Sequence, residues 1–342
     1  MKRRHSPIQH RQKRSLKPLW LTMAAIAAVL VAIFWIGGSM ERAGKTDAYG
    51  SLEGRFAEAP SVTYQGKTYT AKTKLETFLF IGVDKREDQP TSGISARNGG
   101  QSDFLLLLVF DHTDKTIERI QIDRDTMAEI TVLGILGNAL GTNTHQICLA
   151  HGFGDGREQS CQFTVEAVQR LMEGIAIDGY LSLNMGGINT QNSLLGGVTV
   201  TLQDDFSMYD PAMVPGVTLT LQGNQAEVYV RSRMNVSDGT NASRMVRQQD
   251  FLGKAADVLM QRIKDDANFA GTLFDGMEAY TVTDVSRGKW INEANKAASY
   301  AVGDILTPAG EHTIGEDGFV EFHVDQEALT QMVLEVFFQP AA

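Results

Sequence analysis

Short apolar runs alternate with amphipathic stretches along most of the chain. Three runs, at residues 77–83, 103–110 and 116–122, predict buried strands because each is short, rich in large apolar residues and bounded by turn residues. Two stretches, 164–174 and 326–338, carry apolar residues at helical spacing and predict amphipathic helices. A hairpin is expected at 62–70, a Gly-Gly turn into a strand at 194–202, a further strand at 319–324, and another helix at 290–300. This pattern predicts an α/β fold, an α-β-α layered domain with a central mixed β-sheet flanked by helices.

The first 38 residues differ from the rest in charge and hydropathy. Residues 1–17 contain seven Lys or Arg and no acidic residue, and 18–38 form an apolar run of about 20 residues, the length that crosses a bilayer core. Trp20 and Trp35 lie near its two ends, where interfacial aromatic residues are favoured. A cleaved signal peptide is the alternative, but no clear cleavage site follows before Glu41. The pattern predicts one transmembrane signal-anchor, with the tail in the cytoplasm and the remainder outside.

Two parts are expected beyond the anchor. Residues 39–72 are polar and rich in Gly, Ala, Thr and Glu, and predict an extracytoplasmic spacer. Residues 73–342 are numerous enough to bury one large core and predict the folded domain. The chain has 41 acidic and 31 basic residues, and seven of the basic ones lie in the tail, so the domain is acidic. Because nucleic-acid binding needs a basic surface, no nucleic-acid partner is expected.

The densest candidate chemistry lies at residues 229–249, YVRSRMNVSDGTNASRMVRQQ. This stretch contains four arginines: Arg231, Arg233, Arg244 and Arg247. Its second half opens a predicted helix, with Asn241 or Ser243 as the N-cap, and that helix places Gln248 and the last two arginines on its apolar side. An inward guanidinium needs an anionic partner, and its planar fork suits phosphate or carboxylate. The stretch predicts half of a polyanion site, and structural pairs with Asp or Glu are the alternative.

Acidic residues stand at the ends of the predicted strands. Asp84 follows the first strand, Asp103 opens the second, and Asp123, Arg124 and Asp125 close the third. Sites in α/β folds are built at strand ends, although a single Asp there is most often a turn or cap residue. Mg²⁺ takes one or two protein carboxylates and completes its shell with water and phosphate oxygens. Carboxylates beside an inward arginine face therefore predict a metal–phosphate site.

The chain has only two cysteines, Cys148 and Cys161, and both lie in the part expected outside the membrane. An even number of cysteines in an oxidising compartment favours a disulfide, which here would close a short glycine-rich loop. Two free thiols are the alternative. We expect the disulfide.

Six motifs occur in a fixed order within residues 73–263: FLFIGVD, QSDFLLLLVFD, IERIQIDRDT, LLGGVTVTL, YVRSR and SRMVRQQ. Behind a signal-anchor, this order resembles the LytR-CpsA-Psr family of cell-wall glycopolymer transferases. The resemblance implies a membrane-anchored, Mg²⁺-dependent phosphotransferase in the bacterial cell envelope. Such an enzyme moves a phosphoglycan from a polyprenyl-diphosphate-linked glycopolymer to a hydroxyl group of a peptidoglycan sugar. It also implies a hydrophobic groove between sheet and helices for the lipid tail.

Carried over by position, the resemblance implies roles for the candidate residues. It implies that Asp84 and Asp103 are catalytic and bind the metal, and that Arg124 is catalytic. It implies a set of residues that bind the diphosphate: Arg231, Arg233, Arg244, Arg247 and Gln248. A polyprenyl-diphosphate hydrolase and a non-catalytic wall-binding or regulatory protein of the same fold are the alternatives.

Two positions depart from the family pattern. The family usually has Arg two residues before the second Asp, where this chain has Gln101. The usual Ser-Ile-Pro-Arg-Asp reads Gln-Ile-Asp-Arg-Asp at 121–125, so that Asp123 stands in place of the proline. These departures bear on the strength of phosphate binding and on the choice of substrate.

Overall fold

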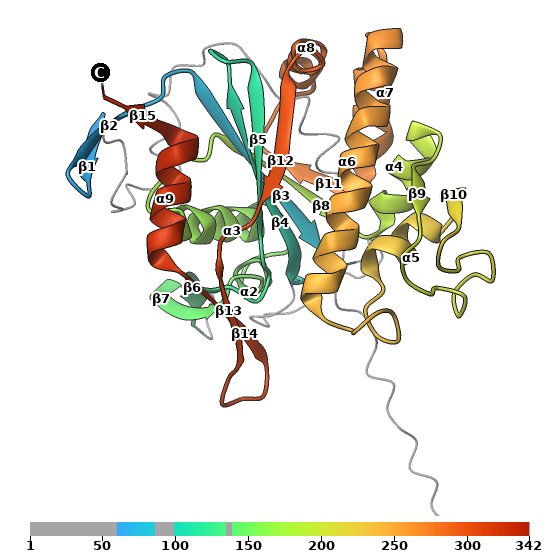
Figure 1. Cartoon of the computed structure of the whole chain (residues 1–342), viewed down its shortest axis with the longest axis horizontal. Coiled ribbons are helices and arrows are strands. Elements are labelled where there is room, and N and C mark those ends of the chain that lie inside the picture. Colours follow the sequence, from blue (N-terminus) through green and yellow to red (C-terminus); the bar gives the residue numbers. More distant parts are fainter. Residues whose placement is uncertain (1–59, 86–98, 135–138, 342) are drawn as a thin grey trace, which may run out of the picture.

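A computed structural model describes residues 60–85, 99–134 and 139–341, and a six-stranded sheet forms the middle layer of the fold (Figure 1). The strand order is β11 (Thr281–Thr283), β8 (Gly179–Asn184), β3 (Leu75–Val83), β4 (Ser102–Asp111), β5 (Thr116–Ile122) and β12 (Ala301–Leu306). The pairs β3–β8 and β5–β12 are parallel and the other neighbours are antiparallel. The prediction of a mixed central sheet is confirmed.

Strand β4 shows why helices must cover both faces of the sheet. All ten of its residues are buried, and its side chains alternate between two cores. Phe104 and Leu106 belong to one core, whereas Leu105 and Leu107 belong to the other. Successive side chains of a strand point to opposite faces, so a strand that is apolar at every position needs cover on both sides.

The helices supply this cover (Figure 1). The first face is covered by α4 (Gly186–Leu195), α5 (Gln225–Arg231), α6 (Asn241–Asp265), α7 (Phe269–Met277) and α8 (Arg287–Ala297). The other face is covered by α2 (Leu149–Gly152), α3 (Glu158–Leu171) and α9 (Gln326–Phe337). Among the described residues this gives three layers, so the predicted α-β-α arrangement is confirmed.

Smaller sheets lie around these layers. They are β1 (Ser61–Tyr64), β2 (Lys67–Ala71) and β15 (Phe338–Pro340); β6 (Met127–Leu133) with β7 (Ala139–Gln146); β9 (Thr199–Thr201) with β10 (Thr218–Thr220); and β13 (Gly310–Ile314) with β14 (Val320–Val324). The predicted β1–β2 hairpin is confirmed, and its turn residues Gln65 and Gly66 both have positive φ, as a two-residue type I′ turn requires. Because β2 pairs with β15, this part of the predicted spacer 39–72 joins the folded domain.

One expected helix boundary moved and one prediction was not reached. The expected Gly-Gly turn into a strand at 194–202 is confirmed, because Gly196 and Gly197, both at positive φ, follow the end of α4 and lead into strand β9. The N-cap of α6 is Thr240, whose hydroxyl accepts the Ser243 amide at 3.2 Å. The part of the chain that the structure describes holds no helix both long and apolar enough to span a bilayer, and the predicted anchor 18–38 and tail 1–17 lie outside it.

Candidate functional site

Three strand ends meet at one edge of the sheet. Because β3 and β4 are antiparallel, the end of β3 adjoins the start of β4. The Gln101 amide donates to the Asp84 carboxylate at 2.7 Å, and the Asp84 amide donates to the Gln101 carbonyl at 3.0 Å. Strand β5 is antiparallel to β4, so its end lies at the same edge. The structure therefore brings Asp84, Asp103 and Arg124 together.

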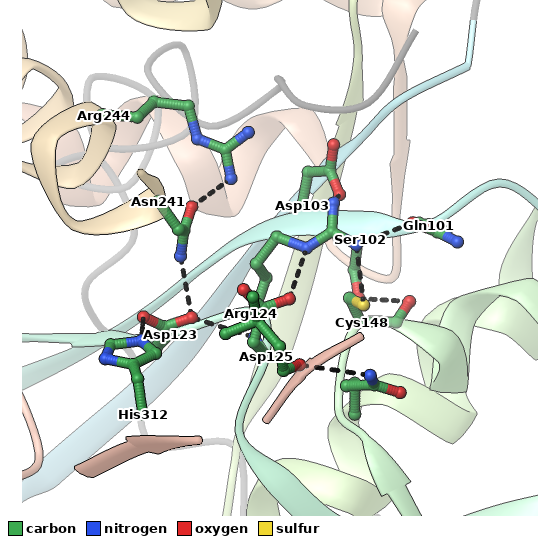
Figure 2. A network of polar contacts seen from close by, with 12 residues as sticks. Gln101, Ser102, Asp103, Asp123, Arg124, Asp125, Cys148, Asn241, Arg244 and His312 are labelled. Carbon is green, nitrogen blue, oxygen red and sulfur yellow. Dashed lines mark hydrogen bonds and ion pairs between the residues drawn. The ribbon is translucent and has the colours of Figure 1, made fainter. Parts of the chain in front are cut away.

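Arg124 is the centre of the polar network at this edge (Figure 2). Its Nη1 forms an ion pair with Asp103, and its Nε donates to Asp125 at 3.1 Å. Its Nη2 donates to the side-chain oxygen of Gln101 at 2.8 Å and to the sulfur of Cys148 at 3.3 Å. Arg124 therefore connects the start of β4, the end of β5 and the start of α2.

The predicted disulfide is wrong, because Cys148 and Cys161 are both free and buried. The Cys148 sulfur lies beside Arg124 just before α2 (Figure 2). Cys161 lies in α3, within the core under that helix, and interacts with Ser182 of β8. Burial raises the pKa of Cys148 to about 12, so its thiol is protonated at neutral pH. The alternative of two free thiols describes the structure.

Three of the predicted arginines converge on the two aspartates. Arg231 ends α5, Arg233 follows it, and Arg244 lies in the first turn of α6. Arg231 acts electrostatically on both Asp84 and Asp103, while Arg233 and Arg244 act on Asp103. The predicted polyanion face and the strand-end carboxylates thus belong to one site.

Arg244 is fully buried, and no described carboxylate forms a hydrogen bond or ion pair with it. Its Nη2 donates to the side-chain oxygen of Asn241, whereas its Nε and Nη1 lack a hydrogen-bond partner among the described residues. Burial lowers the pKa of Arg244 to about 9, against the attraction of Asp103, so the guanidinium is still charged at neutral pH. Since burying an unpaired charge is costly, these two nitrogens are donors suited to an anion.

Arg247 and Gln248 bind protein instead. Arg247 pairs with Asp204 at 2.8 Å through Nη1, and donates from Nε to the Tyr229 carbonyl at 3.2 Å and from Nη2 to the Ser232 carbonyl. Gln248 bonds a glutamine side chain of β5 at 3.2 Å and a carbonyl of α5 at 3.5 Å. Structural pairing, which was the alternative for the arginines, therefore describes Arg247. Both side chains hold α6 against its neighbours.

A second network begins at Asp123 and was not anticipated from the sequence (Figure 2). Its Oδ1 accepts from the Asn241 side chain at 2.7 Å and from the Asp125 amide at 2.9 Å. Its Oδ2 lies 3.1 Å from Nε2 of His312, a residue of β13. Because Asn241 turns its oxygen toward Arg244, the four side chains form one chain of contacts. Nothing in the sequence signalled it, since His312 is 189 positions from Asp123.

Burial sets the protonation of the acidic side chains. Burial first, and repulsion by Asp103 second, raise the pKa of Asp84 to about 7. Burial also raises the pKa of Asp103 and of Asp125, with Arg124 as the main opposing charge. Although burial alone would lower the pKa of Arg124, its acidic neighbours raise it. Arg124 is therefore permanently charged, and Asp84 titrates near neutral pH.

The two strand-end carboxylates would need further ligands to hold a divalent cation. Within the described ranges there is no cluster of three or more His, Cys, Asp or Glu side chains that could hold a metal. Oδ2 of Asp103 is buried and has no hydrogen-bond partner there. Mg²⁺ commonly uses one or two carboxylates and takes its remaining ligands from water and phosphate. Asp84 and Asp103 fit that mode.

A surface pocket lies at the opposite end of α6 from Arg244. It is lined by Ile263 and Lys264 of α6, by Asn295 of α8, and by residues just after these helices that include Tyr300. Along the helix it is about 28 Å from Arg244, at 1.5 Å per residue. The convergent charges and the unpaired buried atoms of Arg244 and Asp103 are at the arginine end, so we place the candidate site there.

Comparison with known proteins shows to which family the chain belongs. The LytR_cpsA_psr family model matches residues 43–336, most of the chain. The chain belongs to the LytR-CpsA-Psr family. The resemblance drawn from the ordered motifs is therefore confirmed.

Relatives within the LytR-CpsA-Psr family are named as transferases. The polyisoprenyl-teichoic acid–peptidoglycan teichoic acid transferase TagU of Halalkalibacterium halodurans is 28% identical over 243 residues, covering 69% of this chain and 70% of that protein. TagV of Bacillus subtilis, named as the same kind of transferase, is 28% identical over 58% of this chain and 46% of its own length. Biofilm regulatory protein A of Streptococcus mutans is 27% identical over 56% of this chain and 46% of its own length. The family thus includes transferase enzymes.

Solved structures share the LytR-CpsA-Psr fold. The crystal structure of Bacillus subtilis TagV has a TM-score of 0.58 at 23% identity, over 77% of this chain and 97% of that one. TagT bound to LI-WTA has a TM-score of 0.57 at 20% identity, over 77% of this chain and 90% of that one. At these identities the likeness establishes the layered architecture.

The raised pKa of Asp84 predicts a pH-dependent stability. Between about pH 4 and pH 7 the folded protein holds a proton on Asp84 that the unfolded chain has lost. The contribution of this proton to the free energy of unfolding is therefore complete below about pH 4. It is lost as the pH rises toward 7, at about 1.4 kcal/mol per pH unit. Asp84→Asn should flatten this slope, measured by chemical unfolding in chelator from pH 5 to 8. The exposed Glu316→Gln is the control, and parallel slopes for native protein and Asp84→Asn would contradict the argument.

The contrast between Arg244 and Arg247 predicts opposite effects on stability. Arg247→Met strips Asp204 of its partner and should cost about 3 kcal/mol, the low end for a broken buried pair because Asp204 is partly exposed. Arg244→Met removes an unpaired buried charge and should leave the free energy of unfolding unchanged or raise it. Urea unfolding of the two variants provides the comparison. A larger loss for Arg244→Met would show that Arg244 is structural.

Proposed function

We propose that the chain is a membrane-anchored, Mg²⁺-dependent phosphotransferase. It moves a phosphoglycan from a polyprenyl-diphosphate carrier to a hydroxyl group of a peptidoglycan sugar. The observation that carries this proposal is the buried guanidinium of Arg244, charged and with two nitrogens that lack a partner in the part of the chain the structure describes, in the same site as Asp84 and Asp103. The substrate class is supported by the relatives named as polyisoprenyl-teichoic acid–peptidoglycan teichoic acid transferases.

The arginines bind and neutralise the diphosphate. Arg244 donates from the inner wall, and Arg231 and Arg233 complete the positive side of the site. Fixed donors in a buried site stabilise developing phosphate charge without reorganising at the moment of reaction. Arg231 also pairs with Glu227 at 2.8 Å, which holds its guanidinium in place. Arg124 pairs with Asp103 and holds its carboxylate in place.

The carboxylates face the acceptor and the cation. In the proposed reaction, the Asp84 carboxylate takes the proton of the attacking sugar hydroxyl. The hydroxyl oxygen bonds to the glycan-linked phosphorus as the bond from that phosphorus to the polyprenyl phosphate breaks. Mg²⁺ would be held by the unpaired Oδ2 of Asp103 with Asp84 as second carboxylate, and when bound it supplies positive charge to the phosphate oxygens.

A regulatory or wall-binding role is the second candidate. It is favoured by the relative named biofilm regulatory protein A. The same arginine site would then bind a diphosphate without turnover. Hydrolysis of the carrier is the variant in which water replaces the sugar hydroxyl.

The assay that separates these functions follows a labelled polyprenyl-diphosphate glycan with and without peptidoglycan. We expect label on peptidoglycan, dependence on Mg²⁺, and loss of turnover for Asp84→Asn and Asp103→Asn with binding partly kept. Arg231→Ala, Arg233→Ala and Arg244→Ala should each weaken substrate binding roughly 10- to 100-fold, and Lys should rescue poorly.

The exposed pair Arg287–Asp275 provides a matched control, since Arg287→Ala should bind normally. Release of label to water in both conditions would favour the hydrolase. Binding without any turnover would favour the regulatory role.

The location of the domain is open to a direct test. The basic tail 1–17 and the apolar run 18–38 favour a cytoplasmic N-terminus and an extracytoplasmic domain. Protease added to intact protoplasts should digest the domain and spare an N-terminal tag. Protection of the domain from outside would contradict the orientation and the wall substrate together.

A further inference from the structure

We propose that His312 is a positioning residue for Arg244. Acting through Asp123 and Asn241, it keeps the arginine free to bind an anion. The inference rests on the proposed diphosphate site and adds to it a group from the C-terminal hairpin. None of the sequence motifs includes this hairpin, and His312 itself does not contact Arg244.

The hairpin β13–β14 is fixed beside the segment that carries Asp123. The Phe322 amide donates to the Asp125 carbonyl at 2.8 Å, and Phe322 forms an isolated bridge with Thr126. The His312 ring lies 4.7 Å from the Phe322 ring, which sets its direction toward Asp123. His312 is thus held by the same residue that docks the hairpin.

Asp123 has two possible partners for its charge. It is buried, with 6% of its surface exposed, and only the Asn241 side chain stands between it and the charged Arg244 in the series of contacts. A direct ion pair would satisfy both groups, but it would occupy the guanidinium donors and cancel the charge that an anion needs.

The structure shows the other arrangement (Figure 2). The Asp123 carboxylate is engaged by His312 on one oxygen and by Asn241 and the Asp125 amide on the other. Asn241 then offers Arg244 a neutral amide oxygen in place of a carboxylate. A neutral acceptor uses one donor and leaves the guanidinium charge intact. His312 and Asn241 therefore hold Asp123 off Arg244.

Replacing the histidine tests this chain of contacts. His312→Phe keeps a ring against Phe322 and removes the nitrogen that contacts Asp123, while His312→Gln keeps a donor at the position of Nε2. Titration of the full-length protein in detergent with inorganic pyrophosphate gives the affinity. We expect His312→Phe to bind roughly 10-fold more weakly, the scale of one lost charge-assisted contact, and His312→Gln to bind like the native protein.

A double-variant comparison identifies Asp123 as the intermediary. In an Asp123→Asn background there is no carboxylate to pair with Arg244, so His312→Phe should have no further effect, which is non-additive behaviour. His323→Ala is the control: His323 lies on the same hairpin but bonds Thr313 and Glu321. It should bind pyrophosphate normally.

Each outcome is decisive. Pyrophosphate binding by the native protein with no loss in His312→Phe overturns the positioning role and leaves the diphosphate site standing. Equal losses in the native and Asp123→Asn backgrounds overturn the relay through Asp123. Weakening in both His312→Phe and His312→Gln, with lowered melting temperatures, assigns His312 a structural role. No binding by the native protein overturns the diphosphate site itself, and with it this inference.

Discussion

The ion pair between Arg124 and Asp103 allows this edge of the sheet to carry charge. Asp103 is buried at the start of a strand that lies between two cores, where an unpaired carboxylate would cost several kcal/mol. Arg124 supplies the countercharge, and its remaining donors fix Gln101 and Asp125. Because β4 and β5 are adjacent antiparallel strands, the two residues meet wherever that register forms. The pairing of β4 and β5 thus determines where the site lies, and α6 brings Arg244 to the same place.

Two arginines one turn apart on α6 divide stability from function. Arg244 and Arg247 are both buried, but they face different neighbours. Arg247 faces α5, whose last carbonyls and the nearby Asp204 use all three of its nitrogens. Arg244 faces the strand ends, where its hydrogen-bond partner among the described residues is the Asn241 amide oxygen. Arg247 thus stabilises the packing of α6, whereas Arg244 is a buried charge with unsatisfied donors. Such local departures from the rules of stable packing are expected at functional sites.

Sequence periodicity predicted what depends on local pattern. The central strands were predictable because both faces are covered and their runs are apolar at every position. The inward face of α6 followed from helical spacing, since its arginines share a side with Phe251 and Leu259. Hairpin β13–β14 was only half predicted because β13 is exposed throughout and shows no apolar alternation. The protein partners of Arg247 and the free cysteines were not foreseen for another reason, since composition and spacing cannot show which backbone or side chain a group will face.

The two departures from the family pattern both lie in this network, and both make the site less positive. Gln101 replaces a guanidinium and accepts from Arg124, where a second cation would repel it. Asp123 replaces a proline and adds a carboxylate, which His312 and Asn241 engage. In each case a neutral amide oxygen, of Gln101 or of Asn241, is the group that meets an arginine. Such an acceptor satisfies a donor at the modest net gain of a hydrogen bond and leaves the guanidinium charge for a ligand. Under the proposed function, the site therefore keeps guanidinium charge for a diphosphate although its own residues carry less positive charge.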